Sequence, residues 1–406
     1  MMDRLPDFPW DSLAPYRERA SSHAEGLVDL SVGTPVDPTP DVIRAALTAA
    51  ADAHGYPQTG GTPALREAVS AWFARRRGVP DVNPDGVLPT VGSKEMVAWL
   101  PTLLGAGPGD VVAFPGIAYP TYDVGARIAG ASPQPMHSLT GLGPMTSTTT
   151  PKLLWVNSPS NPTGRVQGIE HLAKVVRWAR HHGVIVASDE CYAELDWRAD
   201  DLAVEATSGL PTPGAVPSIL DPRVCGGSHE GLLAVYSLSK QSNMAGYRAA
   251  FVAGDPALVG RLLEIRKHAG MMMPWPVQQA MVAALTDDTH VELQKARYGI
   301  RRRRLWSALE GAGYRIEHSD AGLYLWTTRG GDDGGTESGT DSGAHPVTHA
   351  GADWSLVAEM ADLGILVAPG SFYGPAGARH VRISLTATNE RIDAAVRRLA
   401  HRAKEG

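Results

Sequence analysis

The sequence has 406 residues, of which 43% are hydrophobic and 20% are charged, and its formal net charge at pH 7 is −6. A single core usually stops growing at about 250 to 300 residues, so this length predicts two domains. The mild negative charge argues against nucleic acid as a partner. No apolar run approaches the roughly 20 residues of a membrane span, and residues 1–10 do not resemble a signal peptide. Two cysteines are too few for a disulfide scaffold or a thiolate metal cluster, so we expect a cytoplasmic protein without a metal site.

Helical and strand-like patterns alternate through the first two thirds of the chain. Thr62 as N-cap and Pro63 at the first helical position mark the start of the first clear helix. In chain order we predict helices over residues 63–77, 94–104 and 170–182, and buried strands over residues 111–114, 153–157, 184–189, 232–237 and 250–253. This alternation is typical of the α/β class, with a mostly parallel sheet flanked by helices.

The pattern changes after residue 276. It then predicts helices over residues 277–285, 291–310 and 389–404 and a strand over residues 322–327. We therefore predict a large domain over residues 36–276, a smaller α+β domain over residues 277–406, and an N-terminal arm, residues 1–35, that packs with the small domain. Residues 330–351 are rich in Gly, Ser, Thr and Asp and predict a mobile surface loop, and residues 199–228 predict an excursion between two strands.

Two residues near predicted strand ends offer unusual chemistry. Lys240 follows a buried strand and precedes Arg248, so burial and a neighbouring cation would lower the pKa of its amine and make it nucleophilic. A lone lysine at such a place is otherwise a surface charge. Asp189 ends an apolar run, where a carboxylate needs a cationic partner such as a protonated ring nitrogen, although a turn or N-cap aspartate is the alternative.

Further polar residues lie at the same kind of position, where open α/β sheets bind their ligands. Asn161 and Tyr192 offer hydrogen-bond donors suited to a phenolate oxygen of a bound aromatic ligand. A helix that starts with a Gly-Ser pair makes an anion site from its amides, to which hydroxyls and a guanidinium can add donors. The residues of this predicted phosphate site are Gly92, Ser93, Lys94, Ser237, Ser239 and Arg248.

The order and spacing of these residues resemble the fold-type I, class I aminotransferases, which depend on pyridoxal phosphate. Asn161 precedes Asp189 by 28 residues, Asp189 precedes Tyr192 by 3, and Lys240 precedes Arg248 by 8. The resemblance implies that Lys240 carries the cofactor covalently and moves the proton, and that Asp189 faces the ring nitrogen. Asn161 and Tyr192 would contact the phenolate oxygen.

The resemblance adds residues that spacing alone does not reveal. Tyr119 corresponds to the aromatic residue that stacks on the cofactor ring, and Tyr56 to the tyrosine that reaches the phosphate of the neighbouring subunit, which implies a homodimer with shared active sites. Arg382 corresponds to the arginine that clamps the substrate α-carboxylate, assisted by Asn161, and Gly33 to the glycine whose backbone approaches it. For Arg382 the alternative is a surface salt bridge.

Longer segments are similar to the N-succinyldiaminopimelate aminotransferases of lysine and diaminopimelate biosynthesis. They lie at residues 8–11, 29–38, 98–105, 118–127 and 266–272. This resemblance implies amino transfer between N-succinyl-LL-2,6-diaminopimelate and 2-oxoglutarate, which yields N-succinyl-2-amino-6-oxopimelate and glutamate. Lys267 and His268 are candidates for the distal carboxylates, with ordinary surface residues as the alternative. Residues 372–374 would form a wall that closes over the substrate.

Other reactions suit the same residues. An aspartate- or aromatic-type aminotransferase or a carbon–sulfur β-lyase would use Lys240, Asp189 and Arg382 equally, because reaction type in this fold depends on pocket shape. A non-catalytic pyridoxal-phosphate-binding regulatory module is the alternative from another class.

Overall fold

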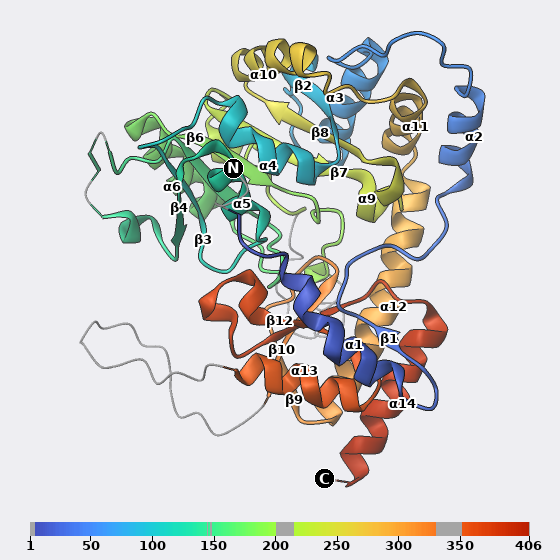
Figure 1. Cartoon of the computed structure of the whole chain (residues 1–406). Helices are drawn as coiled ribbons and strands as arrows, with labels where there is room; N and C mark the ends of the chain where they lie inside the picture. The colour runs from blue at the N-terminus through green and yellow to red at the C-terminus, as the bar shows by residue number, and fades with distance from the viewer. Residues whose placement is uncertain (1–4, 144, 147, 200–214, 330–350, 406) are drawn as a thin grey trace.

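The structure, a computed structural model, describes residues 5–143, 145–146, 148–199, 215–329 and 351–405 (Figure 1). Its elements form a large lobe, from α2 to α11, and a small lobe, from β9 to α14 together with α1 and β1. Figure 1 shows helix α12 (Thr289–Gly311) running between them. Within the described ranges, no helix combines the length and the apolar character that crossing a membrane requires.

The large lobe is built on a seven-stranded sheet in the order β2-β8-β7-β6-β5-β3-β4. β8 runs antiparallel to both neighbours and the other pairs are parallel, so the predicted mostly parallel sheet is confirmed. The strands are β2 (Val87–Val91), β3 (Val111–Pro115), β4 (Ser132–Met136), β5 (Leu153–Asn157), β6 (Ile185–Asp189), β7 (Leu232–Ser237) and β8 (Ala249–Gly254).

The two strands that the pattern did not predict, β2 and β4, are the two edges of this sheet. Both contain proline in the strand interior, where it removes a ladder hydrogen bond and is tolerated mainly at sheet edges; in the inner strand β3, Pro115 is the last residue. The five inner strands were all predicted, because burial on both faces gives them continuous apolar runs.

Helices cover both faces of the sheet. Alternate residues of β5 enter different cores: Leu154 and Val156 pack in one cluster, whereas Leu153 and Trp155 pack in another. The predicted N-cap at Thr62 is present, because its hydroxyl accepts a hydrogen bond from the Leu65 amide at 3.2 Å. The helices of this lobe are α2 (Asp41–Ala49), α3 (Pro63–Arg77), α4 (Ser93–Leu103), α5 (Thr121–Ala129), α6 (Ile169–His182), α8 (Pro222–Cys225), α9 (Leu238–Gln241), α10 (Pro256–Ala269) and α11 (Trp275–Thr286).

The small lobe contains a four-stranded antiparallel sheet in the order β12-β13-β10-β9. A two-stranded parallel sheet joins β1 to β11, so residues near the N-terminus pack in this lobe, where Leu13, Val28 and Leu30 share a core with Leu309 and Leu399. The elements are α1 (Ala14–Ser21), β1 (Val28–Asp29), β9 (Tyr314–Glu317), β10 (Tyr324–Arg329), α13 (Ala352–Asp362), β11 (Ile365–Leu366), β12 (Ala368–Pro369), β13 (Val381–Ser384) and α14 (Asn389–Glu405).

Most of the first predicted loop and half of the second lie outside the described residues. Of residues 330–351 only Gly351 is described, and of residues 199–228 the stretch 200–214 is not. The described end of the second loop forms α8, which Asp221 caps by accepting a hydrogen bond from the Arg223 amide at 2.9 Å.

Candidate active site

Lys240 lies on α9, a single turn that follows β7 directly. Its amine donates a hydrogen bond to the carbonyl oxygen of Gly33, so the structure brings together two residues that the sequence places 207 positions apart. Burial lowers the pKa of this amine; Arg382 and Arg248 lower it further, while Tyr324 opposes them. A buried amine with a lowered pKa is the form that attacks an aldehyde.

Asp189 ends β6 and carries a buried carboxylate without a cation beside it. The carboxylate accepts hydrogen bonds from the Tyr122 hydroxyl at 3.0 Å and from the Cys191 amide at 3.2 Å, and it forms no ion pair with any residue in the described ranges. Burial raises its pKa. A protonated pyridine nitrogen would supply the missing positive charge, so this site fits the ring of pyridoxal phosphate.

Arg382 and Asn161 meet although they come from different lobes. The guanidinium on β13 donates to the Asn161 side-chain oxygen at 3.1 Å and to the Ser31 carbonyl at 2.7 Å. Its Nε atom is buried and has no hydrogen-bond partner among the described residues, and the two Nη atoms together keep two further protons. These free donors have the planar geometry that binds a carboxylate. The position of Asn161 is itself fixed, because its backbone amide donates to the side-chain oxygen of Asn157 at 2.8 Å.

Tyr324, which the sequence analysis missed, lies at the centre of the site. The centroid of its ring is 3.9 Å from the Arg382 guanidinium carbon, and its hydroxyl is 3.1 Å from that of Tyr192. A Cβ atom on Gly33 would lie 2.1 Å from the Tyr324 hydroxyl, so only glycine fits there. Burial would raise the pKa of Tyr324, but Arg382 and Lys240 lower it more. No spacing rule singles out a tyrosine at the start of a strand.

The predicted phosphate site gathers at the start of α4. Gly92 has a φ of +83°, and a Cβ atom there would lie 2.1 Å from the Arg248 guanidinium, so the two residues are in direct contact. Ser237 and Ser239 are buried, with their hydroxyl oxygens 2.8 Å apart. Burial raises the pKa of the Cys191 thiol, two residues after Asp189, and Ser93 opposes this shift. The amides at a helix start, hydroxyls and a guanidinium are together suited to a phosphate.

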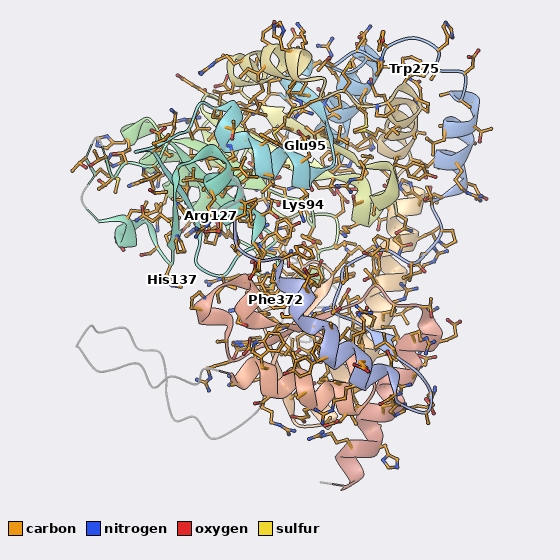
Figure 2. All side chains as sticks on the ribbon, in the orientation of Figure 1. Lys94, Glu95, Arg127, His137, Trp275 and Phe372 are labelled. Atoms are coloured by element: carbon orange, nitrogen blue, oxygen red, sulfur yellow. The ribbon has the colours of Figure 1, made fainter. Side chains whose placement is uncertain are left out.

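Lys94 and Tyr119 face each other at the junction of the lobes. The Lys94 ammonium lies 6.0 Å from the centroid of the Tyr119 ring and 5.8 Å from that of Phe8. In Figure 2, Lys94 lies at the lower edge of the large lobe and Phe372 at the upper edge of the small lobe. Aromatic contacts connect these edges, because Trp10 packs against Phe8 at 5.6 Å and against Phe372 at 5.2 Å.

The structure does not bring three predicted residues to this site within one chain. Tyr56 is 97% exposed. Lys267 and His268 lie in the last turn of α10, where Lys267 pairs with Glu264 at 2.6 Å and His268 is exposed. Their predicted roles depend on a second subunit and stay predictions.

Comparison with known proteins agrees with this geometry. The family "Aminotransferase class I and II" matches residues 25–399. A 4-dedimethylamino-4-oxo-anhydrotetracycline transaminase of Streptomyces rimosus is 55% identical over 98% of this chain and 100% of its own, and a probable aminotransferase of Mycobacterium tuberculosis is 54% identical over 97% and 85%. The solved structure of a probable N-succinyldiaminopimelate aminotransferase from Thermus thermophilus is 26% identical, with a TM-score of 0.78 over 97% of this chain and 100% of that one. The chain therefore belongs to the class I and II aminotransferases, enzymes that depend on pyridoxal phosphate.

Proposed function

We propose that this aminotransferase moves an amino group between N-succinyl-LL-2,6-diaminopimelate and 2-oxoglutarate. The observation that carries the proposal is the Arg382 guanidinium, which keeps free donors next to Asn161. Glutamate and the free amino end of the proposed substrate both bear a carboxylate on the reacting carbon, so one clamp serves both half-reactions. The five similar segments and the likeness to the Thermus structure support the succinylated substrate.

Each residue then has a defined task. Pyridoxal phosphate, when bound, supplies an aldehyde and an electron-poor ring that accepts negative charge from the reacting carbon. Lys240 would hold the cofactor, and its buried amine would be the group that moves the proton of the reacting carbon. Asp189 would keep the ring nitrogen protonated, and Asn161 and Tyr192 would offer donors to the phenolate oxygen. Arg382 orients the substrate, and Gly92, Ser93, Ser237, Ser239 and Arg248 hold the phosphate.

A second candidate acceptor is a ring ketone, which the 55% identical Streptomyces transaminase favours by its name. In that case Arg382 would bind only the amino donor. The deciding experiment loads the purified enzyme with the amino group of glutamate, removes free glutamate, and offers either the succinylated 6-oxopimelate or the 4-oxo anhydrotetracycline compound. Amination of the first supports the proposal, and amination of the second alone rejects it. Pyruvate and ammonia from a sulfur amino acid would instead indicate a β-lyase.

Replacing Arg382 by alanine is expected to lower kcat/KM for glutamate about 100-fold. The reason is the loss of a two-pronged, charge-assisted contact worth roughly 2.7 kcal/mol. Steady-state kinetics check this, with an amine that lacks a carboxylate as a second substrate, whose use should stay unchanged. Arg315→Ala is the control, because that arginine is exposed and pairs with Glu317 on the same lobe. An equal loss for both substrates would contradict the clamp.

The distal carboxylates of the proposed substrate require a cation besides Arg382. Within one chain, Lys94 is better placed for this than Lys267, because its ammonium lies over Tyr119 and forms no ion pair in the described ranges. We expect Lys94→Met to raise KM for the succinylated substrate about tenfold, which corresponds to the loss of one ionic hydrogen bond. The KM for the amino acid alanine, used as a substrate without a distal carboxylate, should change little. Lys267→Met is the matched variant. If only Lys267→Met raises KM, the distal site lies at a subunit boundary instead.

A further inference from the structure

A chain of four hydrogen bonds runs beside Lys240, from β7 to the start of α12. The Tyr236 hydroxyl donates to the Gln241 side-chain oxygen, and the Gln241 side-chain nitrogen donates to the Ser242 hydroxyl at 3.3 Å. The Ser242 hydroxyl lies 2.8 Å from His290 Nε2, and His290 Nδ1 lies 2.8 Å from Asp287 Oδ2.

The direction of this chain follows from its last member. An ionised carboxylate only accepts, so His290 Nδ1 carries a proton; in the neutral imidazole, which has a single N–H, Nε2 is then the acceptor. Ser242 therefore donates to His290, which leaves its oxygen to accept from Gln241. Hydrogen bonds that point one way polarise each other, so losing one member weakens the rest.

Ser242, His290 and Asp287 have the arrangement of a hydrolytic triad, but Ser242 cannot act as a nucleophile here. It is completely buried, and a nucleophile needs space for a reacting carbonyl within hydrogen-bond distance of its base. The arrangement must therefore act through something that it holds in place.

The segment that it holds is α9. This helix has four residues, too few to be stable by its own backbone hydrogen bonds, and it carries Lys240. Ser242 is its C-cap and donates its amide to the Leu238 carbonyl at 3.2 Å. Asn243, with a φ of +51°, adds a bond from its side chain to Gln294 of α12 at 3.0 Å. Contacts with α12 thus fix the C-terminal end of α9, the turn whose position sets the direction of the Lys240 side chain.

We propose that Ser242, His290 and Asp287 are positioning residues that hold α9 against α12 and so set the direction of the Lys240 amine. This inference rests on the aminotransferase function, with Lys240 as the residue that carries the cofactor. Losing the contact lets α9 turn, which misdirects the amine during proton transfer. Substrate affinity stays, because Arg382 and Asn161 are held by other contacts.

The test compares His290→Ala, His290→Gln, Ser242→Ala and Asp287→Asn in the enzyme loaded with pyridoxal phosphate. We expect His290→Ala and Ser242→Ala to lower kcat for glutamate about 10- to 100-fold, the usual effect of a small misplacement, with KM within about twofold of wild type. The visible absorbance spectrum of the lysine-bound cofactor should change as well. His290→Gln, whose amide oxygen can accept from Ser242, should recover most of kcat.

Asp288→Asn is the matched control. It removes a carboxylate next to Asp287 in sequence that pairs instead with Arg75 at 2.7 Å, so it should behave as wild type. A wild-type kcat and spectrum in Ser242→Ala, with only a lower melting temperature, would overturn the inference. The aminotransferase mechanism is tested separately, because retained activity in Lys240→Ala would contradict the role proposed for Lys240. Ser242→Ala removes a single oxygen atom, so the comparison does not depend on whether His290→Ala folds.

Discussion

Replacing Lys240 by alanine is expected to lower the rate of amino transfer from glutamate at least about 1000-fold, because the role proposed for the amine is both to join the cofactor and to move the proton of the reacting carbon. The effect on stability has the opposite sign. Burial lowers the pKa of the Lys240 amine, so the folded chain binds this proton less tightly than the unfolded chain. The cofactor-free wild type therefore loses stability as the pH falls below the ordinary lysine value, and the variant is spared this loss.

Two measurements check this prediction. Single-turnover reaction with glutamate, followed by the visible absorbance of the cofactor, gives the loss of rate. Thermal unfolding without cofactor at about pH 7 gives the stability, which should equal or exceed that of the wild type. Lys174→Ala is a suitable control, because that lysine is exposed on α6. Retained transamination would remove Lys240 from its proposed role.

Replacing Asp189 by asparagine is expected to lower the rate about 1000-fold, since a neutral amide does not keep the ring nitrogen protonated. Burial raises the pKa of the carboxyl group, so its contribution to stability is complete below the ordinary aspartate value and is lost as the pH rises through the folded value. At neutral pH the cofactor-free variant should therefore be at least as stable as the wild type. Adding cofactor should stabilise the variant less, because the positive ring no longer meets a carboxylate.

Melting temperatures with and without pyridoxal phosphate separate these effects. Tyr122→Phe provides a graded comparison, because it removes only the hydroxyl that donates to Asp189 at 3.0 Å and should cost about tenfold in rate. If the cofactor raised the melting temperature of Asp189→Asn and of the wild type equally, with equal turnover, the ring nitrogen would have to face another group.

Sequence patterns predicted the large sheet well wherever a strand is buried on both faces. The apolar runs at β5 and β7 gave the observed bounds, and capping residues located α3 correctly. The edge strands β2 and β4 were not predicted, because prolines interrupt their apolar patterns. Local patterns therefore describe the interior of the sheet better than its borders.

The candidate site shows a similar division. Spacing and family resemblance pointed to Lys240, Asp189, Asn161 and Arg382, and the structure brings Arg382 to Asn161 and Lys240 to Gly33. Tyr324 and His290 were missed because their contacts join residues 132 and 48 positions apart, which no local pattern records. The roles of Tyr56 and Lys267 stay predictions, because a single chain does not contain the neighbouring subunit on which they depend.

Residues 30–33 connect the two halves of the catalytic apparatus. The Leu30 amide donates to the Leu366 carbonyl, and the Leu30 carbonyl accepts from the Ser384 amide of the small lobe. The Ser31 carbonyl accepts from Arg382, and the Gly33 carbonyl accepts from Lys240. These four consecutive residues therefore connect the contacts of Arg382 and Lys240 through the backbone. Because only one residue separates Ser31 from Gly33, a displacement of this segment would shift the contact of Arg382 and the contact of Lys240 together.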